Sequence, residues 1–190
     1  MRLVRWWPCV ALPLMVLLGL AVGSESTRVD DWFIRTGDAH PALGWLLFFT
    51  AGLTQAVVLA IGIAVAAHRR RGRMVVVMVV APLVALVAVR LVKPVFGRTK
   101  GGALAYPSGH TTLAVVVICL LVVLAGVTAW VVAGAVIAVL LGMLGQSFTY
   151  HYFTDTLGAV LLGTAVVCLA VWTARLDRCQ PRCDVDHSCG

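Results

Sequence analysis

Two short polar segments interrupt an apolar chain and carry the side chains best suited to chemistry. The first is Pro107-Ser108-Gly109-His110, which directly precedes a long apolar run, and the second holds His151 and Asp155. Imidazole transfers protons near neutral pH, and a carboxylate bonded to one ring nitrogen makes the other a better nucleophile. If a helix begins by His151, Asp155 lies four residues on and on the same face. The two segments therefore predict nucleophilic and acid-base chemistry.

The residues around the first segment are suited to binding an anion. Ser108 is predicted to cap a helix, and Gly109 allows close backbone approach, so free N–H groups and the positive end of the helix dipole face an anion. Lys93, Arg98 and Lys100 precede this segment on a glycine-containing loop and can bind the same anion through charge-assisted hydrogen bonds. Phosphate is the natural occupant of such a site.

The composition decides where the chain folds. It is 190 residues long, 61% hydrophobic and 12% charged, with a mean hydropathy of +0.99, which indicates an integral membrane protein. Only helices fit, because the apolar runs lack the alternation of barrel strands. We predict an all-α, six-helix transmembrane bundle over residues 1–174, followed by a polar tail over 175–190. The six predicted spans are Trp6 to Val22, Gly44 to Ala67, Met74 to Val92, Thr111 to Ala125, Ala129 to Leu144, and Thr156 to Ala174.

Basic residues predict the orientation, because Lys and Arg are retained on the cytoplasmic side. They precede the first span, separate the second from the third and follow the sixth, so both termini are expected in the cytoplasm. The loops 23–43, 93–110 and 145–155 are then outside. The net charge of +7 is explained by this topology without nucleic-acid binding. The N-terminal run ending at Gly23 also fits a cleavable signal peptide, and cleavage there would leave Ser24 outside.

This topology brings the two segments together. His110 and His151 are forty-one residues apart, enough for one span, a turn and a returning span, so both emerge at the outer face. His151 is then placed to attack phosphorus with Asp155 as its orienting partner, and His110 to protonate the leaving oxygen. The arrangement predicts phosphoryl transfer through a phosphohistidine, with no metal and no cofactor.

The motif residues resemble those of the type-2 phosphatidic acid phosphatase superfamily, six-helix membrane lipid phosphatases related to vanadium haloperoxidases. The family pattern is Lys, six residues, Arg-Pro, then Pro-Ser-Gly-His, then Ser-Arg, five residues, His, three residues, Asp. This chain matches Lys93, all of Pro107-Ser108-Gly109-His110, and His151 with Asp155. The resemblance implies His151 as nucleophile, Asp155 as its orienting partner and His110 as general acid. It also implies Lys93, Ser108 and Gly109 as phosphate ligands.

The chain departs from the family pattern at two places. Lys100 and Gly101 stand where the family has Arg-Pro, and a lysine lacks the bidentate geometry of an arginine fork. Leu144 and Gly145 stand where the family has Ser-Arg, which removes a cation that can stabilise the transition state. Arg98 from the first loop is expected to compensate, and Gln146 offers a weaker neutral hydrogen bond.

Other polar residues have plainer interpretations. Ser108 and Asp155 taken singly are helix caps, and His110 taken singly is an interfacial histidine. Arg90 is expected to extend toward the interface or to pack near Lys93 as a structural charge. In the C-terminal segment, a disordered polar tail and a zinc site remain alternatives for four residues, namely Cys179, Cys183, His187 and Cys189.

Two classes of function follow. The first is a hydrolase of the cell membrane that dephosphorylates a lipid phosphate or diphosphate at the non-cytoplasmic face, such as a polyprenyl carrier, phosphatidic acid or phosphatidylglycerol phosphate. A lipid phosphotransferase would use the same histidines. The second is a non-catalytic relative that binds anionic lipid heads, motivated by the glycine at position 145. Membrane lipids are the expected partners in either case, and the oligomeric state is left open.

Overall fold

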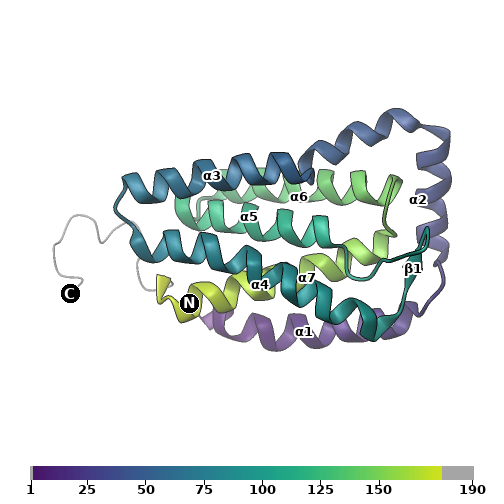
Figure 1. The fold of residues 1–190 in the computed structure, drawn as a ribbon, viewed down its shortest axis with the longest axis horizontal. Coiled ribbons are helices and arrows are strands. Elements are labelled where there is room, and N and C mark those ends of the chain that lie inside the picture. The colour runs from purple at the N-terminus through teal and green to yellow at the C-terminus, as the bar shows by residue number, and fades with distance from the viewer. Residues whose placement is uncertain (1, 177–190) are drawn as a thin grey trace.

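The computed structural model describes residues 2–176, and this part of the chain is helical apart from short connections and a small hairpin (Figure 1). The prediction of an all-α protein is confirmed. The elements are α1 (Arg2–Val22), α2 (Arg28–Ala39), the 3₁₀-helix η1 (Pro41–Phe49), α3 (Gly52–His68), α4 (Gly72–Phe96), β1 (Thr99–Lys100), β2 (Ala103–Leu104), α5 (Gly109–Ala125), α6 (Ala129–Phe148) and α7 (Phe153–Thr173).

Five segments of the described residues are long and apolar enough to cross a membrane, and this indicates a multi-pass membrane protein. They are α1 from Val4, η1 with α3 as one stretch, α4, α6 and α7. The α5 helix is apolar but has 17 residues, or about 26 Å at the usual rise, against about 30 Å of hydrocarbon. The predicted count of six spans therefore depends on α5, and it stays a prediction.

The outward faces of the bundle are apolar, as expected for helices in contact with lipid. On α4, exposed side chains recur every three or four residues at Val76, Val80, Leu83, Val87 and Leu91. A soluble protein rarely exposes so large a continuous apolar surface. The lipid-facing and core-facing sides of the helices are therefore both hydrophobic.

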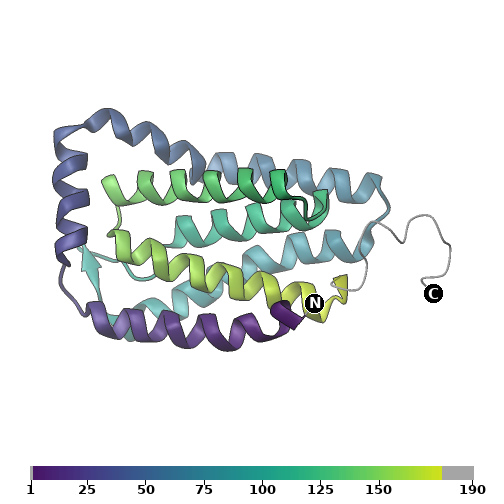
Figure 2. The same cartoon turned by 180° about the vertical axis from the view of Figure 1, so that it is seen from behind.

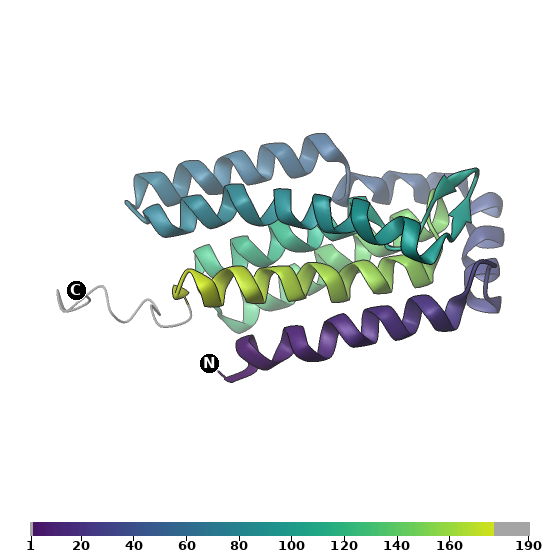
Figure 3. The same ribbon diagram turned by 60° about the horizontal axis from the view of Figure 1, so that its bottom comes forward.

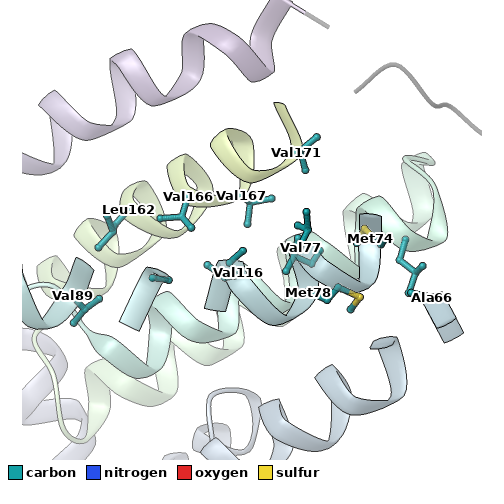
Figure 4. Packing of buried hydrophobic residues seen from close by; sticks show 14 of the residues in the cluster. Ala66, Met74, Val77, Met78, Val89, Val116, Leu162, Val166, Val167 and Val171 are labelled. Carbon is teal, nitrogen blue, oxygen red and sulfur yellow. The ribbon is translucent and has the colours of Figure 1, made fainter. Parts of the chain in front are cut away.

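The α5 helix lies at the centre of the bundle and is covered on several sides. It packs against α3, α4, α6 and α7, while α1 packs along α7 on the outside of the bundle (Figure 2). In the core, Val77 and Val89 of α4, Val116 of α5 and Leu162 and Val167 of α7 belong to one buried cluster, with Val89 toward Leu162 and Val77 toward Val167 (Figure 4). Because the short α5 is enclosed by longer helices, the bundle has room at one end of α5 for a recessed site.

Residues 23–43 were expected as an outer loop between two spans. Most of these residues are helical, while their position outside stays a prediction. They contain α2, which lies across the end of the bundle, and the start of η1 (Figure 1). Thr27 caps α2 by accepting a hydrogen bond from the Asp30 N–H, and the Asp30 carboxylate accepts one from the Thr27 N–H. Such a reciprocal capping box starts a helix without an apolar run. Phe33 then stacks on Phe153 with ring centroids 4.6 Å apart, which fixes α2 over the start of α7.

The two ends of the bundle differ in composition. The start of α1, the α3–α4 turn with its arginines and the last turn of α7 lie at one end, and α2 and the hairpin lie at the other (Figures 1 and 3). This is the grouping that the basic residues predicted. Which end faces the cytoplasm stays a prediction.

Tyr106 fixes the segment that leads into α5. Its side chain is 1% exposed, its hydroxyl donates to the Met15 carbonyl of α1, and its ring meets Phe96 of α4 edge to face at 4.9 Å. A Cβ at Gly158 of α7 would lie 2.5 Å from this ring, so the glycine makes room for it. Three helices thus hold the backbone that precedes Pro107-Ser108-Gly109-His110.

Candidate active site

A pocket of about 880 Å³ opens between α4, α5, the hairpin and the α6–α7 connection. It is lined by both candidate histidines, His110 and His151, and by two of the expected cations, Lys93 and Lys100. The sequence predicted that these four residues and Arg98 converge at one end of the bundle, and the four line this pocket together. Leu86, Val89 and Leu113 line the same pocket. They lie toward the bundle interior, because α4 ends at the site and α5 begins there.

His151 and Asp155 meet, although α7 begins only at Phe153. His151 lies just before the helix, its N–H donates to the Gln146 carbonyl, and its side chain is 12% exposed. The Nδ1 atom of His151 lies 3.6 Å from Asp155 Oδ2, which is beyond hydrogen-bond distance. This Nδ1 atom is buried and has no hydrogen-bond partner in the described residues. The carboxylate therefore faces the Nδ1 side of the ring, and a closer approach of under 1 Å would complete the bond.

His110 lies in the first turn of α5, where the backbone favours anions. The N–H groups of Gly109 and His110 have no helical acceptor, because helix bonds run from each N–H to the carbonyl four residues earlier. Both residues line the pocket. The backbone N–H groups and the imidazole are the parts of the expected anion cradle, and anion binding here stays a prediction.

Ser108 does not line the pocket. Its side chain is fully buried and accepts from the Thr111 N–H and hydroxyl, so the predicted helix cap is confirmed. The Ser108 N–H donates to the Asp155 carbonyl at 3.2 Å, which ties the start of α5 to the start of α7. In this structure Ser108 holds the two segments together, and its expected role as a phosphate ligand is not supported by its position.

The two lysines line the pocket while bonding to backbone carbonyls. Lys93 Nζ donates to the Leu104 carbonyl, and Lys100 Nζ donates to the His151 carbonyl at 2.8 Å. An ammonium group has three donors, so each lysine keeps two for an anion. Burial lowers the pKa of Lys100, and the negative charges of Asp155, Asp30 and Asp38 oppose that effect. Lys100 thus fixes the loop that carries His151 and presents charge to the pocket.

Arg98 is placed differently from the expectation. Its side chain is fully buried behind the pocket and does not line it. One guanidinium nitrogen bonds Asp155 Oδ1 at 3.1 Å and the Thr154 hydroxyl, and the other bonds Asp30 Oδ2 at 2.8 Å and the Glu25 carbonyl. These partners could not be expected from the sequence, because Asp30 is distant in the chain. Arg98 is therefore a structural cation here, and compensation for a missing phosphate ligand was the wrong role for it.

The position of Gly145 also has a structural explanation. A Cβ there would lie 2.6 Å from the backbone of Leu46 in η1, so α6 and η1 are in direct contact at this glycine. No arginine fits without moving η1. Gln146 is buried too and donates to the Thr50 hydroxyl at 2.8 Å, so it is not the neutral donor that was expected.

Two charged residues at this end of the bundle were not predicted from the sequence as part of the site. One lines the pocket and the other lies behind it. Arg90 lines the pocket and is exposed to it, one turn before Lys93 on α4. The sequence analysis expected Arg90 at the interface or near Lys93, and an arginine inside an apolar span is also a common signal of function. Asp30 joins the site from α2, and its only sequence signal was the Thr27–Asp30 capping pair.

Comparison with known proteins found no family model, no curated protein and no solved structure that matches the chain. The resemblance to the type-2 phosphatidic acid phosphatases thus rests on the motif residues and stays a prediction. Within residues 2–176 no group of three or more His, Cys, Asp and Glu is arranged to hold a metal ion. The cysteines and the histidine of the tail lie outside the described residues.

Proposed function

We propose that the chain is a membrane lipid phosphatase that works through a phosphohistidine on His151. The observation that carries the proposal is the common lining of one pocket by His110, His151, Lys93 and Lys100. Two imidazoles, two ammonium groups and a helix N-terminus around one cavity form a site for a tetrahedral dianion. As a group these features favour phosphate chemistry over helix capping or interfacial anchoring.

The chemistry can be assigned to atoms. The Nε2 atom of His151, on the ring edge away from Asp155, attacks phosphorus while the bond to the leaving oxygen breaks. His110 gives its proton to that oxygen, so the lipid leaves as an alcohol or as a monophosphate. A water then attacks the phosphohistidine and loses a proton to His110, and the N–P bond breaks to release inorganic phosphate. Lys93 and Lys100 balance the charge on the phosphoryl oxygens.

The pocket also favours a lipid substrate. Its charged groups lie at the end of the bundle, and Leu86, Val89 and Leu113 continue it toward the interior of the helices. A headgroup at the histidines would place the first carbons of a lipid chain beside these apolar residues. The substrate class is accordingly a phosphate or diphosphate ester of a lipid, at the membrane surface that the basic residues predict to be non-cytoplasmic.

A second candidate is a non-catalytic protein that binds anionic lipid heads. The contact between Gly145 and η1 favours the binding protein, because the backbone of η1 fills the space that the side chain of a third-motif arginine would need. A lipid phosphotransferase is the alternative within the enzyme class, and it differs only in the acceptor that takes the phosphoryl group from His151.

The test is release of inorganic phosphate by the purified full chain in detergent, with a panel of lipid monophosphates and diphosphates, against His151→Ala. We expect turnover by the natural chain and loss of at least about a thousandfold in the variant. His68→Ala, in the last turn of α3 at the other end of the bundle, is the matched control and should turn over normally.

Equal turnover by His151→Ala would rule out the proposed nucleophile. Headgroup binding without phosphate release by the natural chain would support the binding protein. Phosphate appearing on an added lipid alcohol instead of in solution would support the transferase.

A further inference from the structure

We propose that Asp30 is a positioning residue of the site, which acts through Arg98 to set how much negative charge Asp155 presents to His151. This inference rests on the role of His151 in the proposed function. Asp30 does not line the pocket, and it belongs to a helix that the sequence predicted as a loop. Its connection to the site runs entirely through buried hydrogen bonds.

The first step of the connection is the bond between Asp30 and Arg98. Asp30 Oδ2 accepts from Arg98 at 2.8 Å, and the side chains of both residues are 0% exposed. Its carboxylate also accepts from the Thr154 N–H and hydroxyl at the start of α7. Asp30 therefore binds both the guanidinium and the helix on which Asp155 lies.

The second step is the bond between Arg98 and Asp155. The nitrogen that reaches Asp155 Oδ1 at 3.1 Å belongs to the same guanidinium that bonds Asp30. Asp155 Oδ2 accepts from the Tyr152 N–H at 3.1 Å and faces His151 Nδ1 at 3.6 Å. Asp155 is thus shared between a cation behind it and the imidazole in front of it.

The charges behind Asp155 sum to zero only because Asp30 is present. Asp30 carries one negative charge and Arg98 one positive charge, so the Asp155 carboxylate remains uncompensated and can stabilise a protonated His151. Without the charge of Asp30, Arg98 would be balanced by Asp155 alone. The carboxylate would then stabilise the imidazolium less, and His151 would lose its proton more easily.

The other charged groups around His151 are not themselves substituted when Asp30 or Arg98 is changed. Lys100 bonds the His151 carbonyl from β1. Burial lowers the pKa of Lys100, the charges of Asp155, Asp30 and Asp38 raise it, and the charge of Arg98 lowers it. The remaining groups that share the pocket with His151 are His110 of α5, Arg90 and Lys93 of α4, and Tyr150 before α7. A difference between variants of Asp30 and Arg98 therefore reports on the net charge of this pair, which acts on His151 through Asp155 and on the neighbouring Lys100.

The experiment compares four forms of the full chain in detergent: the natural chain, Asp30→Asn, Arg98→Gln, and the double variant. The charge behind Asp155 is zero, +1, −1 and zero in that order. The acid limb of kcat/KM against pH reports the proton on His151, which must be absent for attack. We expect it to move to lower pH in Asp30→Asn and to higher pH in Arg98→Gln, each by on the order of 0.5–1 pH unit.

The double variant should return to the limb of the natural chain, although its rate is lower. A role of Asp30 in stability alone would lower activity without this ordered shift. Asp31→Asn is the matched control, because Asp31 is the next residue and accepts from Ser26 instead of Arg98, and its limb should not move. If Asp30→Asn is recovered unfolded, the test compares Arg98→Gln with the neutral double variant. The acid limb should then lie at higher pH in Arg98→Gln than in the double variant.

A limb that stays fixed in all active variants, or that moves the opposite way, would overturn the inference while leaving the phosphatase intact. The same order is expected in an NMR titration of the ring-labelled histidines, with His151 assigned from His151→Ala. That measurement needs no turnover. Absence of phosphate release with the ordered shift in the titration would overturn the proposed function and keep the charge arrangement.

Discussion

The pocket and the buried network behind it adjoin each other at one end of the bundle, and they treat charge in opposite ways. In the pocket, cations predominate: Arg90, Lys93 and Lys100 line it. In the network, one cation is enclosed by two carboxylates, because Arg98 bonds both Asp30 and Asp155. An excess of positive charge favours the binding of an anionic ligand, whereas the buried network pairs its one cation internally and carries no excess of positive charge. Asp155 belongs to the network and faces the pocket only through His151.

This comparison predicts that the two regions fail differently when changed. Removal of a pocket residue should reduce turnover and leave the fold intact. Removal of a network residue should reduce the stability of the fold, and turnover should fall because less of the protein is folded. The following variants test this difference, from the largest expected effect to the smallest.

His110→Ala should give the largest change and should affect turnover alone. A general acid is worth about 10²–10⁴-fold in rate, so kcat should fall by that factor while the thermal midpoint in detergent stays within a few degrees. The loss should be smaller for a substrate with a good leaving group, such as an aryl phosphate, which needs no proton. A uniform loss over both substrate types would contradict the role as acid.

Asp30→Ala should give the largest loss of stability. Breaking a buried ion pair on one side costs about 3–5 kcal/mol, because Arg98 would keep its charge with one partner fewer. Burial alone would raise the pKa of Asp30, but hydrogen bonds from Thr154, Thr27 and Arg98 outweigh it and lower the pKa. Ionised Asp30 therefore stabilises the fold above its ordinary pKa of 3.8, and this contribution is lost as the pH falls through the lowered value.

The measurement is the unfolding midpoint in detergent from neutral pH down to about pH 3. The natural chain should lose more stability over that range than Asp30→Asn, which has no carboxylate to protonate. Lys100→Ala is the comparison from the pocket and should unfold within about 1 kcal/mol of the natural chain. Equal losses for Asp30→Ala and Lys100→Ala would show that the network is no more structural than the pocket.

Gly145→Arg tests whether the third-motif arginine can be restored. The backbone of η1 lies 2.6 Å from the position of the new Cβ, and it cannot move as a flexible side chain would. We expect a loss of stability of at least about 1–3 kcal/mol and no gain in phosphate release. Gly145→Ala isolates the effect of the added Cβ, and Gly134→Ala, on the same helix where a Cβ would meet no atom within 4 Å, is its control. A faster Gly145→Arg enzyme would mean that η1 moves away in the active state.

The sequence predicted the all-α class, and it predicted the residues that converge, for identifiable reasons. Apolar runs indicate the order of the long helices, and the spacing of His110 and His151 then predicts both at one end. The same reasoning missed α2, because a capping box starts it and no apolar run marks it. It also misjudged Arg98. A loop position does not reveal a buried carboxylate partner such as Asp30, which lies 68 residues away.

Arg90→Gln gives the smallest expected effect and addresses the arginine that the sequence analysis interpreted as structural. Arg90 is about 9 Å from the end of α4 along the helix axis, within the apolar span, and a cation at such depth is expensive unless it faces a cavity. In the described residues it has no hydrogen bond or ion pair with another side chain, and it lines the pocket one turn deeper than Lys93. An anionic headgroup would supply the missing partner.

The variant should raise KM by about tenfold, which is the loss of one charge-assisted hydrogen bond, with kcat within about twofold. Arg73→Gln removes the same charge from the other end of α4 and should leave both constants unchanged. A fall in kcat with KM unchanged would mean that Arg90 acts on the transition state, and then the missing arginine at position 145 would have a substitute on α4. If KM and kcat of Arg90→Gln equal those of the natural chain, Arg90 is a structural cation like Arg98. The excess of positive charge in the pocket would then come from Lys93 and Lys100 alone.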